Sequence, residues 1–255
     1  MQFSANIGFL YDDLPIPERI RAARADGFDA VECHFPYDVD AGEVADALAE
    51  TGLPMLGLNT QPGESFGYLA MPGQEVEARA AIDEAVAYGR RIGAGAVHAM
   101  AGKSGGGTAA ERVYRENLAY ACDKAGAAGM TVLIEPINHR DAPGYHLYTV
   151  EHGAEIIGGV GAENLRLMFD CYHTQIMQGD LLTRFRDVQP VIGHVQIAAV
   201  PDRGEPGGGE VHYLNLLAEM ARMGWAAPVG AEYKPRSGKT AEGLSWLAEF
   251  RAALK

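Results

Sequence analysis

Strand-like and helix-like segments alternate eight times along this chain, and this alternation restricts its fold more than any other feature. We expect strands near residues 3–9, 30–35, 53–59, 96–101, 131–137, 165–171, 192–199 and 227–233. We expect helices near 15–26, 42–51, 74–92, 108–129, 149–158, 179–187, 213–223 and 240–253. Strands separated by helices are typical of parallel sheets. The prediction is one α/β domain over residues 1–255, a closed (β/α)8 barrel, with an open doubly wound sheet as the alternative.

Composition is that of an ordinary globular protein, with 47% hydrophobic and 22% charged residues. A net charge of -13 opposes binding to nucleic acid but does not exclude a small anionic substrate. Three cysteines, none in a Cys-x-x-Cys pair, argue against a disulfide framework or a structural zinc site. We find no apolar stretch long enough to span a membrane and no signal-peptide pattern, so we expect a cytoplasmic protein.

Oxygen-bearing side chains stand at the ends of the last four expected strands. These side chains are Glu135, Asp170, Gln196 and Glu232. In a barrel the carboxyl ends of the strands converge on one face, where active sites lie. Three carboxylates gathered without a cation would repel one another, and oxygen ligands favour Mg²⁺ or Mn²⁺. The alternative is that each side chain only binds loop backbone.

Other polar residues follow the strands toward the same face. His173 is a candidate donor to a substrate oxygen, and Arg203 a candidate bidentate partner for a carboxylate. Their alternatives are a loop histidine and a surface arginine. Weaker candidates lie at or just after other strand ends: Asn59, His98, Lys103 and Glu32. We expect His34 and His194 to pack or to support the ligands.

Several segments together resemble one known family. They are FSANIGFLY, VECHFPYD, IEPINHRDAPGYHL, DCYHTQIMQGDL, GHVQIAAVPDRGEPGGGE and EYKP. In these segments the chain resembles the hydroxypyruvate isomerase family, which belongs to the xylose-isomerase-like TIM barrels. The likeness runs from residue 3 to about 250 and is most specific in the second half.

The resemblance implies roles for particular positions. The family's divalent metal ligands match Glu135, Asp170, Gln196 and Glu232, and its proton-transferring pair matches the two glutamates. In the related ketose epimerases, residues that touch substrate match His173, Arg203 and Asp141, the last shorter by one methylene than the usual glutamate. Those epimerases have a histidine where this chain has Gln196, which favours the hydroxypyruvate isomerase branch.

The function implied is a metal-assisted isomerase of the aldose–ketose type. We expect a small hydroxy-oxo acid, hydroxypyruvate, to give tartronate semialdehyde through an enediolate. One glutamate would remove a proton from carbon and the other return it, while Arg203, His173 or Lys103 would bind the substrate carboxylate. Alternatives are a 2-oxo-tetronate isomerase, a ketose 3-epimerase, a metal-dependent endonuclease, which the net charge opposes, and a non-catalytic sugar-acid binding protein. Assembly into a homo-oligomer is left open.

Overall fold

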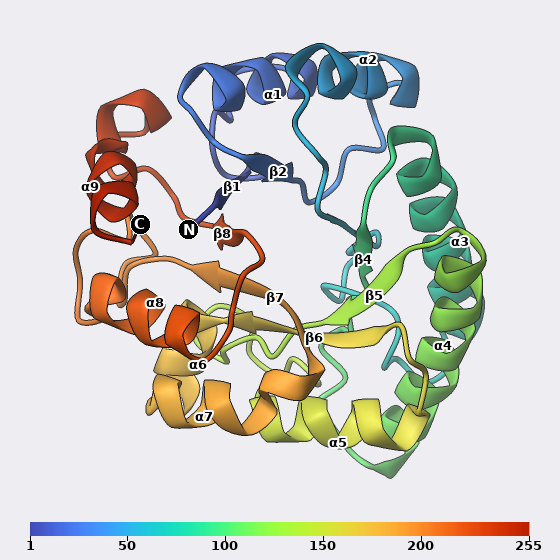
Figure 1. Cartoon of the computed structure of the whole chain (residues 1–255). Coiled ribbons are helices and arrows are strands. Elements are labelled where there is room, and N and C mark those ends of the chain that lie inside the picture. Colours follow the sequence, from blue (N-terminus) through green and yellow to red (C-terminus); the bar gives the residue numbers. More distant parts are fainter. Residues whose placement is uncertain (255) are drawn as a thin grey trace.

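Parallel strands form a ring in the computed structural model, and helices surround the ring (Figure 1). Residues 1–254 are described. The strands are β1 (Phe3–Asn6), β2 (Ala30–Glu32), β3 (Leu58–Asn59), β4 (Ala96–His98), β5 (Thr131–Ile134), β6 (Leu165–Asp170), β7 (Ile192–Ile197) and β8 (Val229–Ala231). The α-helices are α1 (Ile16–Ala25), α2 (Ala41–Thr51), α3 (Glu75–Ile92), α4 (Thr108–Ala127), α5 (Val150–Val160), α6 (Cys171–Met177), α7 (Leu181–Val188), α8 (Tyr213–Arg222) and α9 (Ser245–Ala253). Two short 3-10 helices are η1 (Gln189–Val191) and η2 (Thr240–Gly243).

The sheet closes on itself. Its order is β2-β1-β8-β7-β6-β5-β4-β3, so the first and last strands of the chain are neighbours. The remaining gap is closed by backbone hydrogen bonds from Val31 N to Pro54 O (3.0 Å) and from Leu56 N to Val31 O (2.8 Å). The predicted (β/α)8 barrel is therefore confirmed, and the open doubly wound sheet is wrong.

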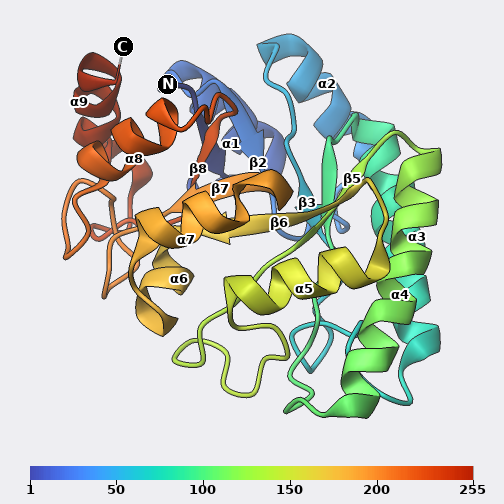
Figure 2. The same cartoon turned by 60° about the horizontal axis from the view of Figure 1, so that its bottom comes forward.

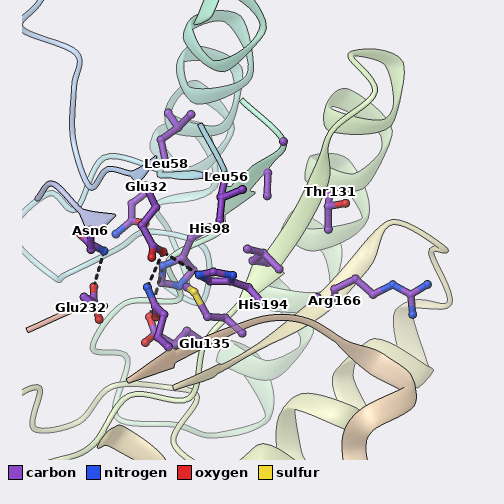
Figure 3. A pocket seen from close by; sticks show the side chains of 18 of the residues that line it. Asn6, Glu32, Leu56, Leu58, His98, Thr131, Glu135, Arg166, His194 and Glu232 are labelled. Carbon is purple, nitrogen blue, oxygen red and sulfur yellow. Dashed lines mark hydrogen bonds and ion pairs between the residues drawn. The ribbon is translucent and has the colours of Figure 1, made fainter. Parts of the chain in front are cut away.

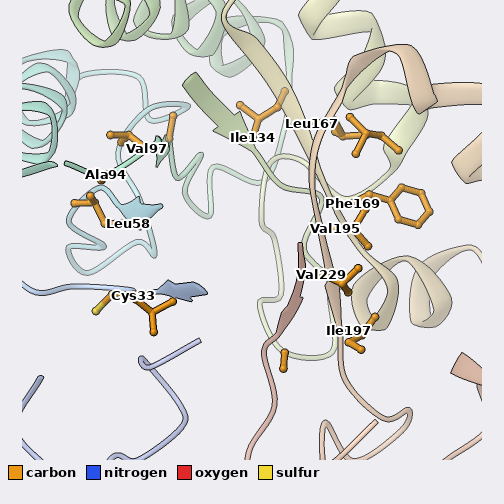
Figure 4. Close-up of a cluster of buried hydrophobic side chains, with 14 of the residues drawn as sticks. Cys33, Leu58, Ala94, Val97, Ile134, Leu167, Phe169, Val195, Ile197 and Val229 are labelled. Carbon is orange, nitrogen blue, oxygen red and sulfur yellow. The ribbon is translucent and has the colours of Figure 1, made fainter. Parts of the chain in front are cut away.

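Successive side chains of each strand point alternately into the apolar layer under the helices and into the barrel interior. Outward side chains such as Ile134, Phe169, Val195 and Ile197 pack into the large apolar layer between strands and helices (Figure 4). A small separate apolar cluster of Ala96, Leu133 and Met168 comes from the alternate, inward positions. Because successive side chains of a strand point to opposite faces, the outward apolar set fixes which residues face the barrel interior.

The elements differ from the prediction in three places. The segment expected as a strand at 53–59 has regular strand structure only at β3; Pro54 and Gly57 lie in its first part, and both residue types weaken strands. The helix expected at 240–253 is divided into η2 and α9. Helix α6 was not predicted; it begins directly after β6, and Asp170 caps it by accepting from Tyr172 N at 2.6 Å.

Long segments after β4 and β5 lie on the same side of the barrel as α6 (Figure 2). This is the face toward which the carboxyl ends of the strands point. Among the described residues, no helix is long and apolar enough to cross a membrane.

Helix α9 attaches the end of the chain to β1 through an aromatic cluster. Trp246 is 2% exposed and packs against Phe3, Phe250 and Tyr233, with ring centroids 5.5, 5.3 and 6.1 Å away. Its indole Nε1 donates to the Tyr233 hydroxyl at 3.3 Å. The cluster thus fastens α9 against the neighbouring strands β1 and β8.

We expect Trp246→Ala to lower the free energy of unfolding by about 3–5 kcal/mol, because it leaves a large cavity in this cluster. Chemical denaturation monitored by circular dichroism measures the change. Val76→Ala is the matched control, since Val76 is 79% exposed and its truncation should change stability by no more than about 0.5 kcal/mol. Equal effects of the two substitutions would contradict the role given to the cluster.

Candidate functional site

The four predicted ligands all face the barrel interior at the carboxyl end of the sheet. Asp170 and Gln196 lie on β6 and β7 and are direct register partners. Glu135 and Glu232 follow immediately after β5 and β8. All four are buried, with at most 6% of each residue exposed. The structure therefore brings together the residues that the sequence placed at four separate strand ends.

These side chains are close enough to share one ion. Glu135, Asp170, Glu232 and His173 each offer a ligand atom, and these atoms lie within 4.8 Å of one another. Gln196 adds an amide oxygen from the strand beside Asp170. Carboxylate and amide oxygens are the ligands preferred by hard divalent cations.

Three oxygens in this group have no hydrogen-bond partner among the described residues, although they are buried. They are Glu135 Oε1, directly after β5, Asp170 Oδ2 on β6 and Gln196 Oε1 on β7. An unpaired buried polar atom is destabilising and requires an explanation. Two of these acceptors belong to residues of the close cluster and the third to the register partner of Asp170, so the group fits a divalent cation.

A second group of potential metal ligands provides a contrast. Glu111, His146 and His152 also lie close together, on α4, the segment after β5 and α5. Here Glu111 Oε2 pairs with Nε2 of both histidines at 3.0 Å, and its Oε1 binds Arg115. The ligand atoms of this cluster already satisfy one another, unlike the three unpaired oxygens at the strand ends.

Glu232 is surrounded by donors. Its Oε2 accepts from Arg203 Nη2 at 2.6 Å, and its Oε1 lies 2.7 Å from His34 Nε2 and 3.1 Å from Asn6 Nδ2. Burial alone would raise the pKa of this carboxyl, but Arg203 and His34 lower it below its ordinary value. Glu232 is therefore held as a carboxylate.

Glu135 and Asp170, unlike Glu232, have pKa values above their ordinary values. Burial, followed by the charges of Glu232 and Asp170, raises the pKa of Glu135 well above its ordinary value. Burial, followed by the charge of Glu232, raises the pKa of Asp170 to about 7. Without a cation the environment of Glu135 favours its neutral form, whereas that of Glu232 favours the carboxylate, so the two glutamates differ strongly.

His173 lies on α6, so the alternative of a loop histidine is wrong. Its Nδ1 lies 2.6 Å from Asn138 Nδ2 and 3.3 Å from Asn138 N, so this nitrogen accepts and Nε2 carries the proton. Nε2 faces Glu135 Oε1 at 3.7 Å and Asp170 Oδ2 at 3.8 Å. Burial, with the charge of Arg203, lowers the pKa of His173 well below its ordinary value.

Arg203 is not a free surface residue. Its guanidinium lies between the rings of Phe9 and Tyr172, 5.0 and 4.9 Å from their centroids. It pairs with Glu232 and lies 3.5 Å from Asp141 Oδ2. This places a fixed positive charge above the carboxylates.

Two cavities meet at the strand ends. The upper cavity, of about 170 Å³, has an aromatic and aliphatic rim that includes Phe9, Phe35 and Phe66. A larger cavity of about 340 Å³ extends down inside the barrel as far as Thr131 and Arg166 (Figure 3). Both cavities are lined by Asn59, His98, Glu135 and Glu232.

The remaining predicted substrate-binding residues differ in whether they line the two cavities. Asp141 lines the upper cavity, and Asn59 and His98 line both. Burial lowers the pKa of His98 to about 3, and its ring lies 3.6 Å from Glu135 Oε2. Lys103 is exposed, with its Nζ 5.5 Å from the centre of the Phe66 ring, and it is not among the residues that line these cavities. Its predicted contact with substrate stays a prediction.

The sequence did not single out two residues that support the site. Asn6 binds Glu232, and Asn138 binds His173. Both contacts join segments far apart in the chain. The only local signal was that Asn6 ends β1 and that Asn138 closes the motif containing Glu135.

Comparisons with known proteins agree with this arrangement. A family model described as a xylose isomerase-like TIM barrel matches residues 20–250. The 2-oxo-tetronate isomerase of Cupriavidus necator is 42% identical over 98% of each chain, and the hydroxypyruvate isomerase of Escherichia coli is 36% identical over 98% of this chain and 100% of its own. A crystal structure from Brucella melitensis, described as an AP endonuclease of family 2, has a TM-score of 0.93 and 38% identity, covering 97% of this chain and 98% of that one. The chain therefore belongs to the xylose isomerase-like TIM barrel family, as an isomerase of the group that contains hydroxypyruvate isomerase and 2-oxo-tetronate isomerase.

Proposed function

We propose that this protein isomerises a three- or four-carbon hydroxy-oxo acid, with hydroxypyruvate to tartronate semialdehyde as the first candidate. The observation that carries the proposal is the set of three unpaired buried oxygens beside two glutamates of opposite acid–base tendency. Pairs of titratable groups with contrasting environments are typical of acid–base catalysis.

Glu135, Asp170, Gln196 and Glu232 would hold a divalent cation, Mg²⁺ or Mn²⁺. When bound, the cation would stabilise negative charge that develops on the two substrate oxygens. A cation would also offset the repulsion among the three carboxylates. The choice between the two metals is part of the proposal.

The two glutamates move the proton. One glutamate would take the proton from the hydroxyl-bearing carbon, leaving an enediolate, and would then release it to solvent; the other would deliver a proton taken from solvent to the former carbonyl carbon. The proton of the substrate hydroxyl would move to the former carbonyl oxygen, so that substrate and product remain isomers. Isomerisation is reversible, so each glutamate acts as the acid in one direction and the base in the other. His173 Nε2–H, which faces Glu135 and Asp170, would donate to a substrate oxygen.

Arg203 would attract the substrate carboxylate. It is the fixed cation on the rim of the upper cavity, and its Nη1 has only a 3.5 Å contact with Asp141. A guanidinium is well suited to bidentate carboxylate binding. Asp141, Asn59 and His98 would contact the rest of the substrate from the walls of the same cavity.

The residue at position 196 argues against a ketose 3-epimerase, because the chain has Gln196 where those epimerases have a histidine. The similarity to the Cupriavidus necator enzyme makes 2-oxo-tetronate the second candidate.

A substrate panel tests the proposal directly. Hydroxypyruvate, 2-oxo-tetronate and neutral ketoses would be incubated with the protein and Mg²⁺ or Mn²⁺, and products followed by NMR. Conversion of an acid and not of the ketoses is the expected result. Binding without turnover would indicate a sugar-acid binding protein, and cleavage of DNA containing abasic sites would support the endonuclease alternative, which the charge of -13 opposes. The cytoplasmic location and the oligomeric state remain predictions.

We expect Glu135→Gln and Glu232→Gln each to lower kcat by at least roughly 10²–10⁴-fold, because each removes a proton-transferring group but keeps an oxygen. Steady-state kinetics give kcat, and NMR in D₂O reports exchange of the carbon-bound hydrogen. Circular dichroism should show an unchanged fold. Near-normal turnover in both variants would exclude the pair and point to another base.

We expect Mg²⁺ or Mn²⁺ to raise the Tm more at pH 8 than at pH 5. Because burial raises the pKa of Glu135 and Asp170, the metal-free folded state retains protons that the unfolded chain releases, so its stability falls as the pH rises from about 4 toward about 7. The cation binds the deprotonated carboxylates, so its stabilising effect increases over this range. Thermal denaturation with and without metal measures both effects, and Asp170→Asn should reduce the difference. A Tm shift independent of pH would contradict the assignment.

A further inference from the structure

Glu32 and Gln196 meet inside the barrel although they come from β2 and β7. Gln196 Nε2 donates to Glu32 Oε2 at 2.9 Å. Both side chains are buried and line the cavity beneath the strand ends, and Figure 3 labels Glu32 there. This contact therefore joins Glu32 to one of the four residues proposed to hold the cation.

The contact decides which end of the Gln196 amide faces the site. An amide carries donors at one end and an acceptor at the other, and a rotation of the side chain exchanges them. Only the NH₂ end can bind the Glu32 carboxylate. Gln196 Oε1 is consequently turned away from Glu32, and it is one of the three unpaired buried oxygens.

Glu32 is itself fixed on both oxygens. Ser4 Oγ donates to Oε1 at 3.0 Å, and His194 Nε2 lies 2.9 Å from Oε2. The carboxylate is therefore held in one position.

The backbone leaves room for this arrangement only because β8 has a glycine at the crossing point. A Cβ on Gly230 would lie 2.1 Å from Glu32 Oε1 and 2.9 Å from Gln196 Cγ. Glu32 thus reaches Gln196 across a position where any other residue would block it.

We propose that Glu32 is a positioning residue that orients Gln196, so that the amide oxygen and not the amide nitrogen faces the divalent cation. The Glu32 carboxylate also holds the NH₂ group of Gln196 away from the site. It makes the Gln196 amide oxygen a stronger ligand, as outer-sphere carboxylates do for other metal ligands. This inference rests on the proposed function, in which Gln196 is a ligand.

The test measures Mn²⁺ affinity of the full chain by isothermal titration calorimetry. Glu32→Met keeps the side-chain length but removes the acceptor, and we expect it to weaken Mn²⁺ binding by roughly 10–100-fold. Glu32→Gln should bind within a few-fold of the wild type, because its oxygen can still accept from Gln196 while its NH₂ group faces Ser4 Oγ. Ser4→Ala is the matched control, since Ser4 contacts Glu32 but not Gln196, and its affinity should also stay within a few-fold.

A double substitution separates positioning from a general structural effect. If Glu32 acts through Gln196, then Glu32→Met combined with Gln196→Ala should bind Mn²⁺ no more weakly than Gln196→Ala alone. Additive losses would overturn the proposal. Wild-type affinity in Glu32→Met, with weakened binding in Gln196→Ala, would also overturn it and leave the ligand set intact.

Wild-type affinity in Gln196→Ala would instead show that Gln196 is not a ligand, which overturns this inference together with that part of the proposed function. If Glu32→Met does not fold, Glu32→Asp takes its place, because it keeps the charge but withdraws the acceptor by one methylene. We expect Glu32→Asp to weaken binding in the same direction, and wild-type affinity in that variant would overturn the proposal.

Discussion

Mutual repulsion among three buried carboxylates is the constraint on which the rest of this site depends. Glu135, Asp170 and Glu232 lie together with almost no exposure to water. Glu232 obtains its compensation from the protein, through Arg203 and His34. Glu135 and Asp170 do not, and each keeps a bare oxygen. The protein thus gives Glu232 cationic and hydrogen-bonding partners and leaves a bare oxygen on each of the other two carboxyls, so the two glutamates have different protonation tendencies.

The same strand alternation that packs the apolar core also turns the polar side chains of the site toward the barrel interior. Phe169 and Val195 point outward into the apolar layer, which forces Asp170 and Gln196 to point inward. A shift by one residue would expose the apolar set to the interior and turn the ligands toward the helices. A barrel of this sequence therefore cannot pack its outer layer without assembling the polar site.

The sequence was informative wherever a feature depends on local order. Alternation of segments predicted the barrel, and strand-end positions predicted Glu135, Asp170, Gln196 and Glu232. It was uninformative for contacts between side chains from different strands and loops: Gln196 and Glu32 are 164 positions apart, and Arg203 and Glu232 are 29 apart. No pattern in the chain shows that Arg203 would pair with Glu232. Helix α6 is different, because Asp170 as its N-cap was a local signal that the strand assignment concealed.

Two glycines, Gly8 and Gly230, leave the space through which polar side chains reach the proposed ligands. A Cβ on Gly8 would lie 2.2 Å from His34 Nδ1, so any side chain there would displace the ring that binds Glu232. Gly230 has the same relation to Glu32, the partner of Gln196. Neither glycine has a positive φ, so neither is needed for a turn. Each serves by leaving empty the volume that a longer polar side chain then occupies. Gly8 and Gly230 are therefore part of the site, because they leave the space in which His34 and Glu32 reach Glu232 and Gln196.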